Sequence, residues 1–447
     1  MQLNGAGVVQ LLSTVQEVVL GQLDIERSAV ARPAEATGEA RWTSAQRIGF
    51  RWAAIYIVLY CFPFPAGALP GLDWAESLWL DLWQGSIVPW IGTHVLGLEQ
   101  VEFVPNGSGD TLFHWVQLLT DVALATAGTM LWSILDRSRT HYARLSAWLF
   151  LYVRYDIAWE MLRYGLHKVF ALQFVTGPTL SRMFETYGES SPFGLSSTFM
   201  GSSTTYVVLA GVAETLGGAL LFFRRTTTLG ALIVVPVMTN AVLMNFCYDL
   251  PVKIHSSHIL LLTLFLLLPE ARRLTHAIVL GRAVEPVSRP GLTSQGWMRR
   301  VRGALKLLVV AGLVVPPVLM NRDAAARFAE RHPLYGVYEA APDGTPGNVR
   351  AVIIDEVRVL AIQRTSGPLQ RFQIGRSSEP GLLTLLPYRR AGQKVKVQYK
   401  TGDDGALTLT GTIDGESFDL RLRKVPTPSF LLQTRGFHWV NDNAFDR

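Results

Sequence analysis

The chain has very few cysteines and few charged residues for its length. Only Cys61 and Cys247 occur among 447 residues, which excludes a disulfide framework and a cysteine-rich zinc or iron–sulfur site. Charged residues make up 17% of the chain, whereas 49% of it is hydrophobic and 12 residues are tryptophan. Soluble domains have a different balance. The composition therefore predicts a protein that crosses the lipid bilayer several times.

Common catalytic motifs are missing as well. The sequence contains no P-loop, no GxGxxG after a strand, no GxSxG and no HExxH. Nucleotide hydrolysis, dinucleotide binding and the common hydrolase mechanisms are therefore without support. The net charge of +6 comes from basic residues in short loops between apolar runs. The positive-inside rule explains these residues better than nucleic-acid binding does, so we expect no nucleic-acid partner.

Seven apolar stretches approach the length of about 20 residues that crosses a bilayer. Basic residues are concentrated in the loops on one side of these stretches, and such loops stay in the cytoplasm. We therefore expect a multi-pass protein of the inner (plasma) membrane with a cytoplasmic N-terminus and an extracytoplasmic C-terminal domain. The predicted spans are residues 48–64, 112–135, 145–166, 205–223, 229–247, 254–269 and 303–320.

The pattern divides the chain into five segments. Residues 1–46 are expected to be a cytoplasmic amphipathic segment, and they lack the pattern of a cleaved signal peptide. A transmembrane helical bundle follows at 47–275, and its tryptophan-rich loop 67–111 is predicted to lie at the membrane interface or to re-enter the bilayer. The remaining segments are a polar cytoplasmic linker at 276–302, a last transmembrane helix at 303–320 and an extracytoplasmic β domain at 335–447.

Short alternating runs replace the long apolar runs in the last of these segments. Residues 394–425 predict three strands, with Asp414-Gly415 as a two-residue hairpin turn, and residues 351–363 predict one more strand. We expect a small antiparallel sheet or open barrel, which presents a surface to an extracytoplasmic protein or lipid partner.

Charged residues crowd the third predicted span, in RYDIAWEMLRYGLHKVFALQF (154–174). At about 100° per residue, the side chains of Asp156, Glu160, Arg163 and His167 share one narrow face of a helix. Because isolated charge in hydrocarbon is costly, we expect this face to line a paired or hydrated cavity inside the bundle. In the alternative interpretation these groups serve only as hydrogen-bonding links between helices.

Further candidates lie near this face. Lys168, Glu214 and Asp249 are expected beside it as catalytic residues, although a single acid such as Glu214 can also be a structural link. His255 and His258, three residues apart, are candidate metal ligands together with Asp249 or Glu160. The alternative for them is a pair of hydrogen-bonded histidines at a helix end.

Cys61 and Cys247 end two predicted spans on the outer side, where disulfides form. They are therefore a candidate redox pair. The alternative is that both are inert packing residues.

The stretches RYGLHKVFALQF, SPFGLSSTFMGSSTTYVVLAGVAETLGGALLFFRRTTTLGAL and NFCYDLPVKIHSSHILLLTLFLLLPEARRL follow one another between residues 150 and 275. In this order the chain resembles the DoxX-like family of bacterial membrane proteins. The recurrent features are a span that ends in GxxK, here Gly165 to Lys168, and a helix with ExxGGxLL, here Glu214 to Leu221. The whole layout, with its β-rich tail, resembles larger uncharacterised members of that family.

The resemblance implies a four-helix membrane core. Some relatives are linked to quinone-coupled sulfur oxidation or to defence against thiol and oxidative stress. The layout of a helical core with an extracytoplasmic β domain is also similar, more distantly, to vitamin K-dependent carboxylase-like membrane proteins.

Three functional hypotheses follow. In the first, the protein is an oxidoreductase that exchanges electrons and protons with a quinone-like or thiol substrate, with quinone as the candidate cofactor and the charged face handling protons. In the second, the bundle is a non-enzymatic anchor or scaffold that presents the β domain to a partner. In the third, the buried charges serve the transport of a small solute or a proton.

Overall fold

The structure is a computed structural model, and it describes residues 42–69, 71–99, 101–174, 179–284, 296–340, 348–375, 379–388, 393–402, 405–413, 416–436 and 438–439. The chain divides into two compact units, residues 1–47 with 138–142, and residues 48–137 with 143–447. In the first unit, the Trp42 N–H donates to the Thr140 carbonyl oxygen at 3.1 Å. Most of the predicted amphipathic segment 1–46 and the predicted Asp414-Gly415 turn lie outside the described residues.

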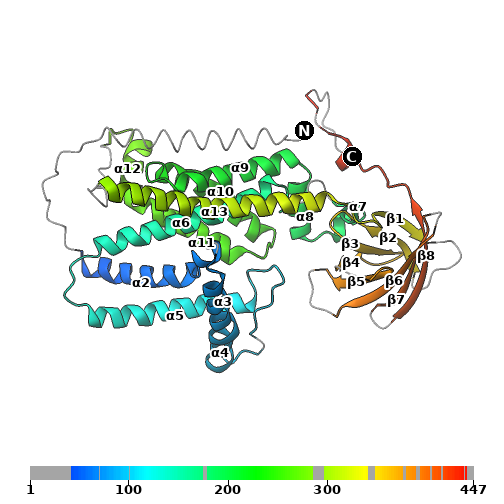
Figure 1. Ribbon diagram of the computed structural model, residues 1–447, viewed down its shortest axis with the longest axis horizontal. Helices are drawn as coiled ribbons and strands as arrows, with labels where there is room; N and C mark the ends of the chain where they lie inside the picture. Colours follow the sequence, from blue (N-terminus) through cyan, green and yellow to red (C-terminus); the bar gives the residue numbers. More distant parts are fainter. Residues whose placement is uncertain are drawn as a thin grey trace. The chain divides into compact units, whose positions relative to one another are not determined.

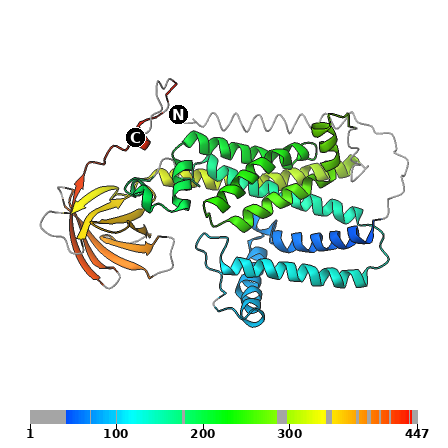
Figure 2. The ribbon, with the colours of Figure 1, turned by 180° about the vertical axis from the view of Figure 1, so that it is seen from behind.

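Helices occupy all seven predicted spans. Figures 1 and 2 show these helices lying side by side. Thr43 and Gln46 start the first of them with a reciprocal capping box, in which each side chain accepts the backbone N–H of the other residue. The seven helices are α2 (Ser44–Cys61), α5 (Leu112–Leu135), α6 (Ala143–Val169), α9 (Thr204–Leu221), α10 (Thr227–Cys247), α11 (Lys253–Leu267) and α13 (Gly296–Ala329).

Five helical stretches in the described part of the chain are long and apolar enough to cross a membrane. They are α5, α9, α10, the stretch Lys253–Val279 and the part of α13 from Gly303 to Arg327. The stretch from Lys253 continues α11 through η5 (Leu268–Glu270), α12 (Ala271–Leu274) and η6 (Thr275–Val279). Helix α6 carries too many charged residues for this group and α2 is too polar overall, so their crossing of the membrane stays a prediction.

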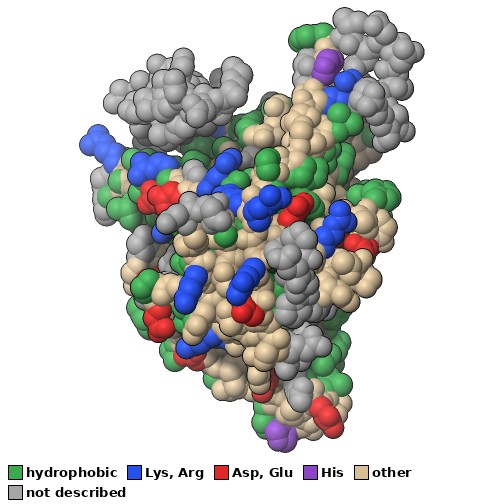
Figure 3. Space-filling model, turned by 90° about the vertical axis from the view of Figure 1, so that its right-hand side faces the viewer, with side chains coloured by type: hydrophobic (Ala, Val, Ile, Leu, Met, Phe, Trp, Pro, Cys, Tyr) green, Lys and Arg blue, Asp and Glu red, His purple; other side chains and the backbone are tan. Residues whose placement is uncertain are grey.

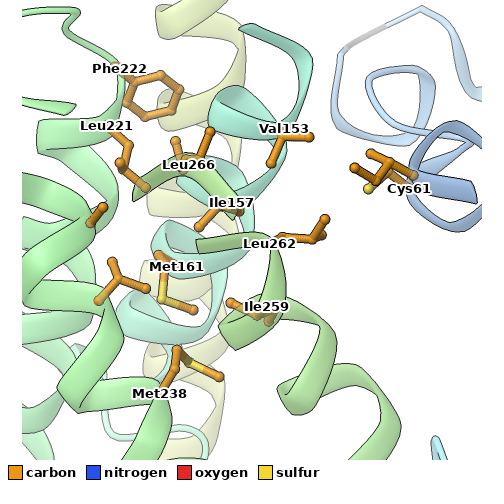
Figure 4. Close-up of a cluster of buried hydrophobic side chains, with 14 of the residues drawn as sticks. Cys61, Val153, Ile157, Met161, Leu221, Phe222, Met238, Ile259, Leu262 and Leu266 are labelled. Carbon is orange, nitrogen blue, oxygen red and sulfur yellow. The ribbon is translucent and has the colours of Figure 1, made fainter. Parts of the chain in front are cut away.

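Helix α6 is the centre of the apolar core. Figure 4 shows its Ile157 and Met161 side chains facing the residues of neighbouring helices, among them Met238 of α10 and Leu262 of α11. Helix α6 packs most extensively against α9, which in turn packs against α10, and α10 against α11. In lipid such contacts are held by close van der Waals packing rather than by removal of water.

The tryptophan-rich loop forms a helical arm that runs across the direction of the long helices (Figure 1). It consists of α3 (Asp73–Leu82), η2 (Trp83–Ile87), α4 (Val88–Trp90) and η3 (Ile91–Val95). The buried Trp83 side chain packs in a cluster with Phe113 of α5, whereas Trp74 and Trp90 are exposed. The remaining short helices are η1 (Ala66–Ala68), α7 (Leu180–Met183), η4 (Tyr187–Glu189), α8 (Pro192–Gly201) and α14 (Leu431–Thr434).

The C-terminal strands form a closed antiparallel barrel in which each strand pairs with the next. The register Val337↔Val425 closes the barrel between the first and last strands, so the expectation of an open barrel was wrong in this respect. Closure removes the exposed strand edges. The strands are β1 (Gly336–Ala340), β2 (Val349–Ile354), β3 (Val359–Arg364), β4 (Gln370–Ile374), β5 (Leu382–Pro387), β6 (Val395–Thr401), β7 (Leu407–Ile413) and β8 (Glu416–Val425).

The single strand predicted at residues 351–363 is instead a hairpin of β2 and β3. Asp355 turns the chain, because its side-chain oxygen accepts the backbone N–H groups of Val357 at 3.1 Å and Val359 at 2.8 Å. Arg358 has a φ of 60°, which a continuous strand would not allow. The three strands predicted at 394–425 are confirmed as β6, β7 and β8.

Strands β1 to β3 are covered on both faces. Leu360 and other apolar side chains fill the barrel interior, while Ile353 and Ala361 belong to a second cluster that contains Leu180 of α7. Strands buried on both faces have continuous apolar runs rather than alternation, and VII at 352–354 follows this rule.

Hydrogen bonds join the α7 segment to the barrel. The Ser181 hydroxyl donates to the buried Asp355 carboxylate at 2.7 Å, and the Leu180 N–H donates to Glu356 at 3.1 Å. The Arg371 guanidinium donates to both oxygens of Glu185, at 2.9 and 3.2 Å, and Arg182 pairs with the same carboxylate. These contacts connect the loop after α6 to the barrel surface.

We expect the contact between α7 and the barrel to weaken in acid. Burial by itself raises the pKa of Glu185, but hydrogen bonds and positive charge from Arg371 and Arg182 outweigh it and hold the pKa below its ordinary value. The ionised carboxylate therefore stabilises the contact at pH values above its unfolded pKa of about 4.3, and this stabilisation is lost as the pH falls through the lower folded pKa. Amide hydrogen exchange of residues 180–185 should rise over that range.

The variant Arg371→Gln should show faster exchange already at neutral pH, because loss of a hydrogen bond to a charged group costs about 1.5 to 3 kcal/mol. Lys400→Gln, on an exposed position of β6, is the matched control and should exchange like the native protein. Equal exchange in native protein and Arg371→Gln would contradict a contribution of this pair to docking.

Candidate functional site

A buried ion pair joins α6 to α9. The Lys168 Nζ donates to both carboxylate oxygens of Glu214, at 2.6 and 2.7 Å, and both side chains are buried. A charge in a bundle is tolerated when a partner of opposite charge compensates it at close range. The structure therefore brings together Lys168 and Glu214, two of the predicted site residues, but as an ion pair with each other.

Two glycines allow the helices to approach closely enough for this pair. A Cβ atom on Gly165 would lie 2.8 Å from the Gly211 carbonyl oxygen, and a Cβ on Gly211 would lie 2.7 Å from the Gly165 carbonyl oxygen. Both distances are shorter than any real Cβ contact, so only glycine fits at either position. The GxxK pattern thus contains Gly165 of the helix contact and Lys168 of the ion pair, whereas on α9 Gly211 lies three residues before Glu214, the first residue of the ExxGG pattern.

The C-terminal half of α6 carries a second charged group. The Glu160 carboxylate accepts from the Arg163 guanidinium at 2.7 Å and lies 3.3 Å from Nε2 of His255 on α11. Asp110 fixes the start of α11, because its carboxylate accepts the N–H groups of Lys253 and Ile254 at 2.7 and 3.0 Å. This cap sets the position of His255 opposite Glu160.

Asp156 lies one turn further into the bundle. Its carboxyl is buried and within hydrogen-bonding reach of the Cys61 thiol at the end of α2. Tyr60 of the same helix lies within electrostatic range of Asp156 and Glu160. Three of the four residues predicted to share a face of α6 thus make polar contacts within the bundle.

Other candidates lie apart from this group. His167 is exposed, and Asp249 is 83% exposed and pairs with Lys253 at 2.7 Å. Both cysteines are free thiols, with Cys61 buried and Cys247 exposed, so they are not bonded to each other in this structure. The helical wheel predicted that His167 shares a face of α6 with Asp156 and Glu160. The neighbouring helices leave His167 exposed, so it does not join their polar group.

His258 does not share a ligand position with His255. Its Nε2 lies 2.6 Å from the Tyr56 hydroxyl and its Nδ1 lies 2.7 Å from the Ile254 carbonyl oxygen, so both ring nitrogens have partners. Among the described residues, no group of three or more His, Cys, Asp or Glu side chains could hold a metal ion. The metal hypothesis therefore lacks the further ligands that it needs.

The sequence analysis missed two polar residues of the bundle. Asp121 of α5 has no exposed surface, and Tyr56 of α2 lies within electrostatic range of it and contacts His258. The signal for Asp121 was present, because it is the one acid between Leu112 and Leu135, and an ionisable residue inside a span is a functional candidate by default. The signal for Tyr56 was absent, since tyrosine is common at membrane interfaces.

The fold and the charged helix contacts define a polytopic helical membrane protein with an appended β-barrel. The family model of DoxX matches residues 149–246, which include all of α9 and most of α6 and α10. The chain belongs to the DoxX family. It is 34% identical over 120 residues to YwoB of Bacillus subtilis (strain 168), itself uncharacterised, and the matched part is 27% of this chain and 75% of YwoB. No solved structure matches the chain.

Removal of one partner of the Lys168–Glu214 pair should destabilise the bundle strongly. Lys168→Met leaves the buried Glu214 carboxylate without compensation, which costs about 3 to 5 kcal/mol. The double variant Lys168→Met/Glu214→Met should regain most of that loss, because no buried charge remains. Thermal unfolding of the detergent-purified protein measures both effects.

Arg322→Met is the control for loss of a positive charge, since its pair with Asp323 on α13 is exposed and should contribute at most about 1 kcal/mol. A double variant that is as unstable as Lys168→Met would contradict the dependence of α6–α9 packing on this pair.

Proposed function

We propose that the protein is a membrane oxidoreductase that acts on a quinone-like or thiol substrate near the outer ends of α6 and α11. The observation that carries this proposal is the Glu160 carboxylate, which is shared between Arg163 and His255. A carboxylate between a permanent cation and an imidazole can hold a proton or release it as the charge of a neighbouring group changes.

The chemistry of such substrates requires proton transfer. Two thiols that are oxidised to a disulfide release two electrons and two protons, and a quinone takes up both to become a quinol. A protein that joins these half-reactions must accept protons from one substrate and deliver them to the other. We assign this exchange to Glu160 and His255, with Asp156 beside the Cys61 thiol as the next acid inward.

The proposed orientation places this site towards the outside of the cell. The basic loops support a cytoplasmic N-terminus in the inner membrane, which puts the ends of α2, the start of α11 and the barrel on the extracytoplasmic side. Disulfides form on that side, so a protein that oxidises thiols would act there.

Glu160→Gln should lower the activity by about 100-fold or more, because the amide keeps the shape of the side chain but cannot exchange a proton. The measurement is the absorbance change of a short-chain quinone mixed with glutathione and the detergent-purified protein, corrected for the reaction without protein. Extraction and mass analysis of the purified protein should also detect bound quinone.

Glu270→Gln is the matched control, because Glu270 is buried and pairs with Arg273 at the same spacing as Glu160 and Arg163. It should keep native activity. The proposal would be refuted by a folded Glu160→Gln protein with native activity, or by a native protein that neither binds quinone nor accelerates the reaction.

A second candidate function is that of an anchor for the barrel, and the barrel surface favours it. Figure 3 views the molecule from the right-hand side of Figure 1, and Lys and Arg side chains (blue) are spread over the face that is visible there. Lys396 and Lys400 of β6 are exposed, as are Arg421 and Arg423 of β8, and the strand register puts Lys400, Thr408 and Arg421 in one row. Such a row suits an anionic lipid surface.

The anchor proposal predicts that protein in phosphatidylcholine nanodiscs binds added phosphatidylglycerol vesicles. The charge reversal Lys400→Glu/Arg421→Glu should abolish this binding, as should high salt, because exposed charges are screened over about 10 Å at 0.1 M salt. Phosphatidylcholine vesicles are the control. Undiminished binding by the reversed variant, or equal binding of both lipids, would refute this role.

A further inference from the structure

Asp121 is an acid in an unusual position. It lies nine residues into α5, has no exposed surface, and neither of its carboxylate oxygens has a hydrogen-bond partner among the described residues. Burial of an ionised carboxylate without a partner costs several kcal/mol. A carboxyl that carries its proton avoids most of this cost and can donate a hydrogen bond.

Tyr56 of α2 lies within electrostatic range of this acid. Its hydroxyl lies 2.6 Å from His258 Nε2. The Ile254 carbonyl, 2.7 Å from His258 Nδ1, can only accept, so Nδ1 carries the imidazole proton and Nε2 accepts from the Tyr56 hydroxyl. The Tyr56 O–H thereby donates to His258, and the phenolic oxygen can still accept a hydrogen bond.

Stacking holds this arrangement in place. The Tyr60 ring stacks on the His258 ring with centroids 3.9 Å apart, and the Trp52 ring stacks on Tyr56 at 5.0 Å. Trp52 is itself anchored by its indole N–H, which donates to Thr126 of α5 at 3.2 Å. The rings of α2 are therefore fixed against both α11 and α5.

We propose that Asp121 is a proton-binding site, and that Tyr56 and His258 connect it to the outer charged group of Glu160 and His255. The first link is made by α11, on which His255 and His258 lie one turn apart and interact electrostatically. This proposal goes beyond the oxidoreductase function, because a proton site in α5 needs no quinone. It assigns to α2 and α5 a role that the charged face of α6 does not have.

The transfer is balanced in protons and charge. A proton on His258 Nε2 passes to the Tyr56 oxygen at 2.6 Å. The phenolic proton passes to the Asp121 carboxylate when a side-chain rotation brings that carboxylate, which has no hydrogen-bond partner among the described residues, into contact with the hydroxyl, so an imidazolium and a carboxylate become two neutral groups. The reverse transfer restores both charges. Titratable and charged groups surround this path on each helix that faces it. They are Asp121 of α5, Tyr56, Tyr60 and Cys61 of α2, Tyr152, Asp156, Glu160 and Arg163 of α6, and His255 and His258 of α11.

Infrared spectroscopy of the full-length protein in detergent tests the proposal directly. The native protein should show the carbonyl stretch of a protonated carboxylic acid, and the isosteric variant Asp121→Asn should lose one such band. Transfer into D₂O shifts the band as the acid proton exchanges. Tyr56→Phe should slow this shift on the order of tenfold or more, because it removes the hydroxyl that carries the proton.

Tyr155→Phe is the matched control, since this tyrosine lies on α6 against Phe222, away from the path. It should exchange at the native rate. Thermal unfolding checks that each variant is folded, and Asp121→Asn should be at least as stable as the native protein, because it buries no acid.

Three results would overturn the proposal. The first is a native spectrum in which Asp121→Asn removes no acid band, which would mean that the carboxyl is ionised. The second is native exchange in Tyr56→Phe, and the third is equal slowing in Tyr155→Phe. None of these measurements uses a quinone or a thiol, so their outcome is distinct from that of the activity test on Glu160.

Discussion

The close contact of α6 with α9 is the constraint on which the charged part of the bundle depends. Gly165 and Gly211 bring the two backbones together, and only at that separation does Lys168 reach both oxygens of Glu214. In a bilayer no hydrophobic force holds helices together, so small residues and a compensated ion pair must do so. The pair also uses the charges of Lys168 and Glu214 structurally, which leaves Asp156 and Glu160, the acids of α6, for chemistry.

Those two acids belong to a polar group that runs through four helices. Glu160 contacts α11 through His255, and Asp156 contacts α2 through Cys61. Tyr56 of α2 contacts His258 and lies within electrostatic range of Asp121 on α5. Each contact crosses between helices rather than along one. The proposed oxidoreductase function and the proposed proton-binding site both use the same property, a set of protonatable groups inside an apolar bundle.

The barrel shows the same dependence on neighbouring elements. Its interior is apolar, as expected for a small barrel. The outer face of β1 to β3 is apolar too, because α7 and the residues around it cover this face. Asp355 serves two purposes there, since it turns the chain between β2 and β3 and accepts the Ser181 hydroxyl. The covered outer face therefore makes the barrel continuous with the loop after α6.

The sequence by itself determined the seven helices, the β-rich end of the chain and the family, because apolar length, strand alternation and the GxxK and ExxGG patterns are local properties. It also grouped Asp156, Glu160 and Arg163, since they share a helix face. Only the tertiary structure decided that Lys168 pairs with Glu214, that His255 rather than His167 meets Glu160, and that Asp121 lies buried near Tyr56. Barrel closure by β1 and β8 was decided in the same way. Each of these contacts joins residues far apart in the chain, and their distance depends on how the helices and strands pack, which no local pattern encodes.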